Sequence, residues 1–231
     1  NKFGACLIKE PNLVADCLNE MQAKTKLPVT VKTRIGYDNV DDYENLYNFI
    51  NLLKSTGIKT FIIHARTAML GNFTPKQNLN IPPLKYEMVY KLKKDFKDLE
   101  IIINGGITSV DQTKSHLNKV DGVMIGRSAY HSPYILSDIE KEIFNNNKIL
   151  SREEVIERFI PYVKQEMKKG VRMNQIMRHT LGLFHGQTGS SFWKRYLSEN
   201  MCVRDADVKK IDHIMDKVKL APQARLAGQI D

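Results

Sequence analysis

Two apolar runs that end in glycine constrain this chain more than any other feature. Ile101–Ile103 runs into Asn104–Gly106, and Gly122–Ile125 stops at Gly126–Arg127. Each run is short and apolar on both faces, as a buried parallel strand is. Residues 109–120, between the runs, carry apolar side chains at helical spacing. The pair therefore predicts two neighbouring parallel strands joined by a crossover helix.

The ends of these two strands have the composition of an anion site. Glycines let an anion approach backbone N–H groups, and Arg127 could donate two parallel hydrogen bonds to a phosphate. In a TIM barrel the phosphate site lies in the loops after the last two strands. A single glycine turn of this kind is more often a tight turn that binds no ligand. Two turns one strand–helix unit apart, the second carrying Arg127, favour phosphate binding.

Further strand–helix units precede this pair. The hydrophobic periodicity predicts helices at 10–26, Asp41–Thr56 and Tyr86–Phe96, and strands at Pro28–Ile35 and Thr60–Arg66. Strands and helices in uninterrupted alternation predict an α/β fold with a parallel sheet. The proline-rich segment 67–84 is too long for an ordinary turn, and we expect it to be an active-site loop.

Basic side chains follow two of the predicted strands. Lys32 and Arg34 are two residues apart, so they point to the same side, and His64 and Arg66 repeat the pattern one unit later. They could be solvated charges on an edge strand, and a lone histidine is often a satisfied core residue. The carboxyl end of a barrel strand, however, opens into the active site, which favours a functional role.

From about residue 133 the chain changes to helices alone. We expect them at Ile135–Phe144, Arg152–Lys169, Met173–Phe184, Ser191–Ser198 and Asp205–Lys219. Residues 151–231 hold fifteen Lys and Arg against ten Asp and Glu, whereas residues 1–150 hold twenty against sixteen. Basic side chains alternate with aromatic ones around Trp193. This pattern suits contacts with nucleic-acid phosphates combined with stacking of the aromatic rings on nucleobases. An amphipathic helix with a charged outer face explains the same pattern equally well.

The bulk composition is compatible with these expectations. A net charge of +9 and a pI near 9.3 suggest an acidic partner such as nucleic acid, although a proteome rich in Lys and Asn would give the same balance. Three cysteines indicate a reducing compartment rather than a disulfide framework. We expect no membrane span and no metal site, and a cytoplasmic location unless a targeting signal lies upstream.

Several motifs are specific when they occur together: Phe3–Leu7, Val29–Gly36, His64–Arg66, Pro75–Lys76 leading to Ile81–Leu84, Asn104–Ile107, Asp121–Arg127, Arg178–His179 and Leu197–Asn200. In this combination they closely resemble the tRNA-dihydrouridine synthases, with the spacing of their A subfamily. The resemblance implies the C-terminal half of an FMN-binding TIM (β/α)8 barrel at 1–134 and an all-helical tRNA-binding domain at 135–231. It implies an enzyme that uses FMN and NADPH to reduce uridine to 5,6-dihydrouridine in the tRNA D-loop.

The resemblance also assigns residues to roles. Arg34 and Arg66 would lie near the flavin and the substrate uracil, where fixed cations stabilise charge on the uracil carbonyl. The tRNA contacts would come from Lys76, Arg178, Lys194 and Arg195. The FMN ligands would be Lys32, His64, Asn104, Gly105, Gly106, Gly126 and Arg127.

The family's catalytic cysteine lies in a motif that this chain lacks, and Cys6 belongs to a later segment. We therefore expect the chain to be a C-terminal fragment, the acid to lie upstream, and the full-length protein to be a monomer. An FMN oxidoreductase acting on a free pyrimidine and a non-catalytic tRNA-binding protein stay open as alternatives. The sequence does not determine which D-loop uridine is modified, or whether NADPH or NADH is used.

Overall fold

A computed structural model describes residues 3–71 and 73–202 of the chain. By its internal contacts the chain divides into two compact units, Asn1–Gly126 and Arg127–Asp231. We call them the sheet unit and the helical unit and describe each by itself. The predicted domain boundary after residue 134 stays a prediction.

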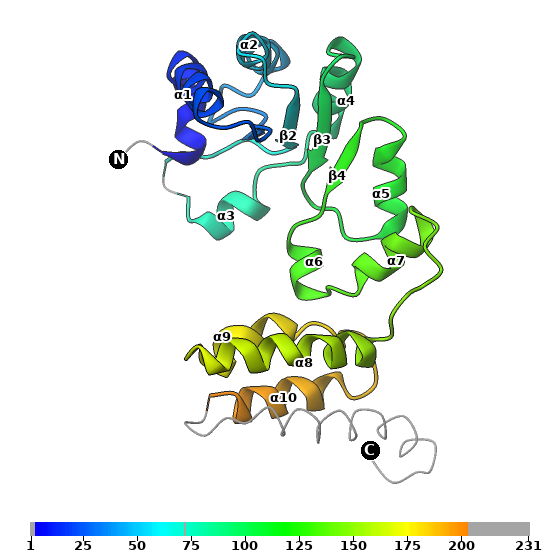
Figure 1. The fold of residues 1–231 in the computed structure, drawn as a ribbon. Helices are drawn as coiled ribbons and strands as arrows, with labels where there is room; N and C mark the ends of the chain where they lie inside the picture. The colour runs from blue at the N-terminus through cyan, green and yellow to red at the C-terminus, as the bar shows by residue number, and fades with distance from the viewer. Residues whose placement is uncertain (1–2, 72, 203–231) are drawn as a thin grey trace. The chain divides into compact units, whose positions relative to one another are not determined.

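The sheet unit contains one four-stranded sheet and the helices that connect its strands (Figure 1). All its strand pairs are parallel, in the order β1-β2-β3-β4, which confirms the predicted α/β fold with a parallel sheet. Its elements are η1 (Gly4–Lys9), α1 (Pro11–Lys24), β1 (Val31–Arg34), α2 (Tyr43–Lys54), β2 (Thr60–His64), α3 (Pro75–Asn80), α4 (Tyr86–Asp95), β3 (Glu100–Asn104), α5 (Val110–Leu117) and β4 (Gly122–Met124).

The register of the sheet aligns the last residues of its strands. Arg34 is opposite His64, His64 is opposite Asn104, and Asn104 is opposite Met124. We call these four residues the strand-end row. Because side chains alternate along a strand, Lys32 lies on the same face as Arg34, one pleat before the row.

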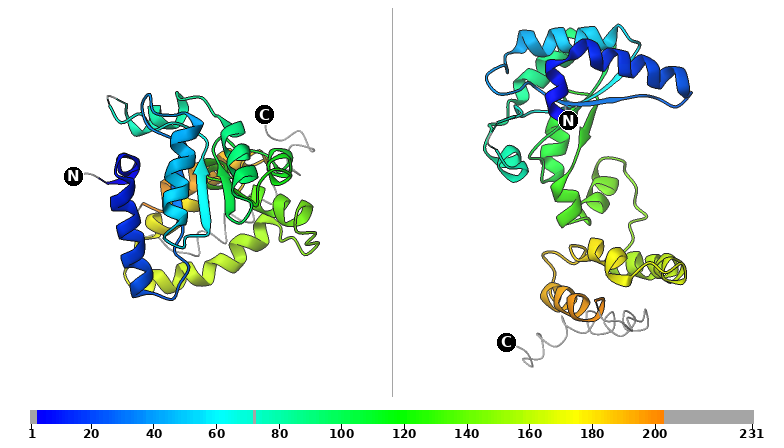
Figure 2. Two further views of the ribbon diagram at one scale, coloured as in Figure 1. Left: turned by 90° about the horizontal axis from the view of Figure 1, so that it is seen from above. Right: turned by 90° about the vertical axis from the view of Figure 1, so that its left-hand side faces the viewer.

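The core of the sheet unit lies on one face of the sheet. Phe61, Ile63, Ile101 and Ile103 are completely buried there, in a cluster that includes apolar residues of α1, α2 and α4. Helices α1 and α2 run side by side above it (Figure 2). Ile62 and its partner Ile102, on the opposite face, are only half-buried. The helices thus bury one face of the sheet and leave the other partly open.

Local sequence sets the ends of α2. Asp42 caps it, because the carboxylate accepts a hydrogen bond from the Asn45 N–H at 2.9 Å. Gly57 follows the helix with φ +92°, a left-handed conformation that glycine adopts without steric cost. Both ends lie within two residues of the predicted ones.

Two details near β2 differ from the sequence-based expectation. Segment 67–84, expected to be an irregular loop, contains α3, which Thr74 and Gln77 stabilise with a capping box. Strand β2 ends at His64, two residues earlier than predicted, because the Arg66 N–H turns back and donates to the His64 carbonyl at 2.7 Å.

The described residues of the helical unit contain helices and no strand. The capping box of Ser151 and Glu154 that was predicted for α8 is present. The predicted helix at Met173–Phe184 is interrupted, α6 was not expected, and the helix expected at Asp205–Lys219 lies outside the described residues. The elements are α6 (Arg127–His131), α7 (Ile135–Glu142), α8 (Arg152–Lys168), α9 (Met173–Met177), η2 (Arg178–Thr180) and α10 (Ser190–Asn200).

Candidate functional site at the carboxyl ends of the strands

Basic groups gather at the strand-end row. Among them, His64 and Arg66 are only 8% and 9% exposed. Burial, and then the charge of Arg34, lowers the pKa of Lys32. Burial, and then the charge of Arg66, lowers the pKa of Arg34. Like charges held together at partial burial disfavour one another, so an anion bound among them would be stabilised.

The two arginines hold segment 67–84 against the strand ends. Arg34 Nη1 donates to the Thr67 carbonyl at 2.9 Å and to the Asn78 carbonyl at 3.0 Å. Arg66 Nη1 donates to the carbonyls of Asn80, at 3.4 Å, and Pro82. Each guanidinium therefore fixes the loop and is itself fixed in place.

Asp41 secures the same loop from the β1–α2 connection, and the sequence analysis did not identify it. Its Oδ2 accepts hydrogen bonds from Lys85 Nζ at 2.5 Å and from Thr67 Oγ1 at 2.7 Å. The bond from Lys85, followed by that from Thr67, lowers the pKa of the Asp41 carboxyl. These partners lie 44 and 26 residues away in sequence, so no local pattern could reveal them.

The glycine turn after β3 has a backbone that only glycine adopts easily. Gly105 has φ +124° and Gly106 has φ +68°. A Cβ on Gly105 would also lie 2.8 Å from the His64 ring and 2.8 Å from Leu84. At the preceding position, Asn104 Nδ2 donates to the Met124 carbonyl at 2.8 Å and joins β3 to β4. The turn therefore presents bare backbone beside the histidine of the strand-end row.

The structure brings together the predicted residues Lys32, Arg34, His64 and Asn104 through the sheet register, with Arg66 and the two glycines beside them. Gly126 ends the sheet unit, and Arg127 begins α6 of the helical unit. The part these two residues play in the site stays a prediction.

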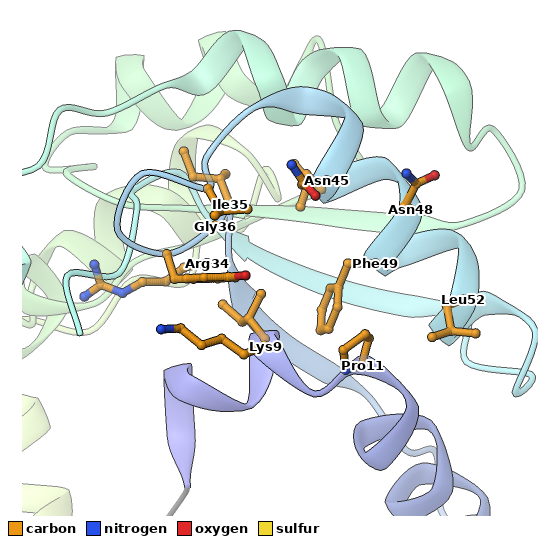
Figure 3. A pocket seen from close by; sticks show the side chains of 13 residues that line it. Lys9, Pro11, Arg34, Ile35, Gly36, Asn45, Asn48, Phe49 and Leu52 are labelled. Carbon is orange, nitrogen blue, oxygen red and sulfur yellow. The ribbon is translucent and has the colours of Figure 1, made fainter. Parts of the chain in front are cut away.

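A cavity of about 340 Å³ is lined by the end of β1, the connection that follows it, the start of α1 and one side of α2 (Figure 3). Phe49 and Leu52 of α2 and Pro11 of α1 line it. Arg34 borders it, but its guanidinium points away from Phe49 and Leu52 (Figure 3). The cavity therefore adjoins the strand ends at Arg34, while much of its apolar lining comes from the helices.

The predicted tRNA contacts Lys76, Arg178, Lys194 and Arg195 are all exposed. Arg178 Nε donates to the imidazole Nε2 of its neighbour, His179, at 3.2 Å. Exposure makes these side chains accessible to a polyanion, and their role as tRNA contacts stays a prediction.

Of the two interpretations left open for the region around Trp193, the structure favours the amphipathic helix for this residue. Trp193 is completely buried, its Nε1 donates to the Thr180 carbonyl at 3.1 Å, and its ring centroid lies 4.9 Å from that of Phe184. Helix α10 is an amphipathic helix with Trp193 and Leu197 in the core and Lys194 outside.

Within residues 3–71 and 73–202, no group of three or more His, Cys, Asp or Glu side chains is arranged to hold a metal ion. Of the helices that the structure describes, none is long and apolar enough to cross a membrane.

A parallel sheet whose strands are joined by helices places the chain in the α/β class of proteins. The model of the dihydrouridine synthase family matches residues 1–219. The chain belongs to this family.

Several relatives are named tRNA-dihydrouridine(20/20a) synthase. One from Synechocystis sp. is 48% identical over 205 residues, which are 88% of this chain and 61% of the relative. One from Shewanella oneidensis is 48% identical over 91% of this chain and 63% of the relative. One from Haemophilus ducreyi is 45% identical over 92% of this chain and 66% of the relative. The chain thus spans between 61% and 66% of the length of these relatives.

Proposed function

We propose that the protein reduces uridine in tRNA to 5,6-dihydrouridine, with FMN as cofactor and NADPH as reductant. The observation that carries the proposal is the strand-end row, which sets Arg34 and His64 in register with Asn104, beside a glycine turn. The names of the relatives support the substrate. Their designation 20/20a leads us to propose the uridines at those two tRNA positions.

We propose further that the four strands are half of a TIM barrel. Their sequential parallel order and the helices between them are those of four βα units. The half-buried face with Ile62 and Ile102 is the face that a closed barrel would turn inward. In this scheme residues 1–134 belong to the barrel and residues 135–231 form a tRNA-binding domain.

The residues present fit the phosphate group of FMN. Gly105 and Gly106 adopt positive φ angles and carry no side chain of their own between their N–H groups and a ligand, and an added Cβ at Gly105 would meet His64. Lys32, Gly126 and Arg127 complete the proposed set of ligands with His64, Asn104 and the two glycines. Bare N–H groups and an arginine are the donors that phosphate sites in proteins use.

FMN would supply the hydride for the C5–C6 bond of uracil. The proposed role of Arg34 and Arg66 is to stabilise the negative charge that develops on the uracil carbonyl in the transition state. Both guanidinium groups are already fixed by backbone carbonyls of segment 67–84, so little reorganisation is needed as charge develops. Segment 67–84 would also exclude water from the strand ends.

The test is direct measurement of the product. The intact protein, unmodified tRNA and NADPH are incubated, and dihydrouridine at each tRNA position is quantified by mass spectrometry. We expect it at positions 20 and 20a. Reduction of free uracil or uridine with no product in tRNA would favour an oxidoreductase of free pyrimidines. Binding of tRNA without reduction would favour a non-catalytic protein.

The cofactor proposal has its own test in Arg127→Glu. A carboxylate at this position would repel a phosphate, so we expect the purified variant to lose bound flavin. Absorbance in the visible range, relative to protein, measures the occupancy. Lys141→Glu is the matched control, because it makes the same charge change at an exposed position of α7. Equal flavin occupancy in both variants would refute the role of Arg127.

A further inference from the structure

Tyr86 connects helix α4 to the glycine turn after β3. It is the first residue of α4, and its hydroxyl donates a hydrogen bond to the Gly105 carbonyl at 2.6 Å, across 19 residues of sequence. A Cβ on Gly106 would lie 3.2 Å from the same hydroxyl oxygen and 2.6 Å from Leu84 Cδ1. Leu84 and Tyr86 therefore form a support directly beneath both glycines.

This hydrogen bond sets the orientation of one peptide group. The Gly105 carbonyl and the Gly106 N–H belong to the same planar trans peptide, so they point in opposite directions. A tyrosine that holds the carbonyl on its own side turns the Gly106 N–H away from itself. Glycine has wide conformational freedom, so the two glycines alone would not fix this peptide plane.

The ring of Tyr86 is held from behind by a buried histidine. The ring centroids of Tyr86 and His116 are 4.6 Å apart at an interplanar angle of 67°, and His116 is 6% exposed. His116 Nδ1 is hydrogen-bonded to the Tyr90 hydroxyl at 2.7 Å. Burial, followed by the charge of Lys119, lowers the pKa of His116, so its imidazole is neutral near neutral pH. The position of the Tyr86 hydroxyl is thus set by packing and not by the turn alone.

We propose that Tyr86 is a positioning residue for phosphate recognition, which keeps the Gly106 N–H presented to the cofactor phosphate by holding the Gly105 carbonyl. The inference rests on the proposed function, because it assumes that the glycine turn binds the phosphate of FMN. It adds a residue to that site that does not touch the ligand. Burial raises the pKa of Tyr86, which keeps its hydroxyl protonated and able to donate.

The test compares FMN with riboflavin, which has the same ring system but no phosphate. Dissociation constants of both are measured by flavin fluorescence for the intact protein and for Tyr86→Phe. Loss of one neutral hydrogen bond predicts about three- to tenfold weaker FMN binding. Riboflavin binding should not change. Tyr43→Phe is the matched control, since it removes a hydroxyl that binds Asp95 at 2.5 Å, away from the turn.

A second readout needs no flavin. The amide nitrogen and proton chemical shifts of Gly106 in the cofactor-free protein should change in Tyr86→Phe and stay unchanged in Tyr43→Phe, because only the first variant frees the peptide group that Gly106 shares with Gly105. Thermal unfolding verifies that Tyr86→Phe, which keeps the aromatic ring against His116, is folded.

The outcomes separate the inference from the function on which it rests. Equal weakening of FMN and riboflavin by Tyr86→Phe, or no weakening of either, would overturn the positioning role while leaving the phosphate site in place. An unmodified protein that binds FMN no better than riboflavin would overturn the phosphate site itself, and the inference with it.

Discussion

The basic residues at the strand ends and those on α10 differ in how they are held. In the sheet unit, Arg34 and Arg66 donate hydrogen bonds to backbone carbonyls of segment 67–84. In the helical unit, Lys194 and Arg195 are exposed on the outer face of α10. Basic side chains thus serve as fixed donors at the strand ends and as solvated charges on α10.

This difference predicts that substitutions in the two groups of basic residues will affect ligand binding and catalysis in different ways. Fixed donors in a partly buried site stabilise charge at one point and depend on geometry. Solvated charges attract a polyanion over a Debye length, tolerate changes of geometry and weaken with salt. Four variants, each with a matched control, test this comparison, from the largest expected effect to the smallest.

Trp193→Ala tests whether the two units are energetically separate. Trp193 is completely buried beside Phe184, so we expect its removal to lower the free energy of unfolding of the helical unit by about 3–5 kcal/mol. Urea unfolding followed by circular dichroism measures this effect. Phe192→Ala, at a half-buried position of the same helix, is the control with a smaller expected loss. Loss of flavin from Trp193→Ala under native conditions would show that the units depend on each other.

Arg34→Lys should be costly although it preserves the charge. One guanidinium nitrogen bonds two carbonyls, of Thr67 and Asn78, and an ammonium group has a different shape and reach. Losing a hydrogen bond to a charged group costs about 1.5–3 kcal/mol, so we expect kcat/KM for tRNA reduction to fall about 10- to 100-fold. Arg195→Lys should leave kcat/KM nearly unchanged. Similar losses in both variants would contradict the comparison.

Replacing Lys194 and Arg195 together by Ala should weaken tRNA binding uniformly across tRNA sequences. Each phosphate contact contributes about 0.9 to the salt slope, so the slope should fall by about two units. Flavin content should not change. A matched double variant, Lys164→Ala with Lys168→Ala, removes two exposed charges from α8 and should lower the slope less. Identical slopes for both double variants would show that only net charge matters.

The smallest expected effect is the contribution of Asp41 to stability at acid pH. Lys85 and Thr67 hold its pKa below the usual 3.8. A depressed carboxyl pKa stabilises the fold above the ordinary pKa, and that stability is lost as the pH falls through the folded value. Between about pH 7 and about pH 3, thermal stability should therefore fall less in Asp41→Asn than in the wild type. Asp16→Asn, at an exposed position of α1, should follow the wild-type curve.

The parallel sheet could be predicted from sequence because its signals are local. The apolar run at Ile101–Ile103 and the spacing of Phe49, Ile50 and Leu53 each determine one element. The short helix α3 was missed because Pro75 and several Asn residues read as loop, although Thr74 and Gln77 form a capping box. In so short a helix the caps matter more than the hydrophobic pattern does.

The residues that the register aligns at the strand ends could be named from sequence, but their hydrogen-bond partners could not be. Arg34 bonds Asn78 across 44 residues, and Tyr86 bonds Gly105 across 19. Such contacts follow from how the loops fold over the sheet, and no spacing rule encodes them. For Trp193 the sequence left two interpretations open, and its burial with Leu197 shows that helical spacing described its environment better than the local mixture of basic and aromatic residues did.

The burial of Trp193 also gives the protein an internal optical probe. Trp193 is the single tryptophan of the chain, and it lies in the core of the helical unit. Its emission therefore reports on the helical unit, while a flavin bound at the strand ends would absorb and emit in the visible range. Because tryptophan emission overlaps flavin absorption, energy transfer between them would measure how far apart the two units lie in solution, and whether tRNA changes that distance.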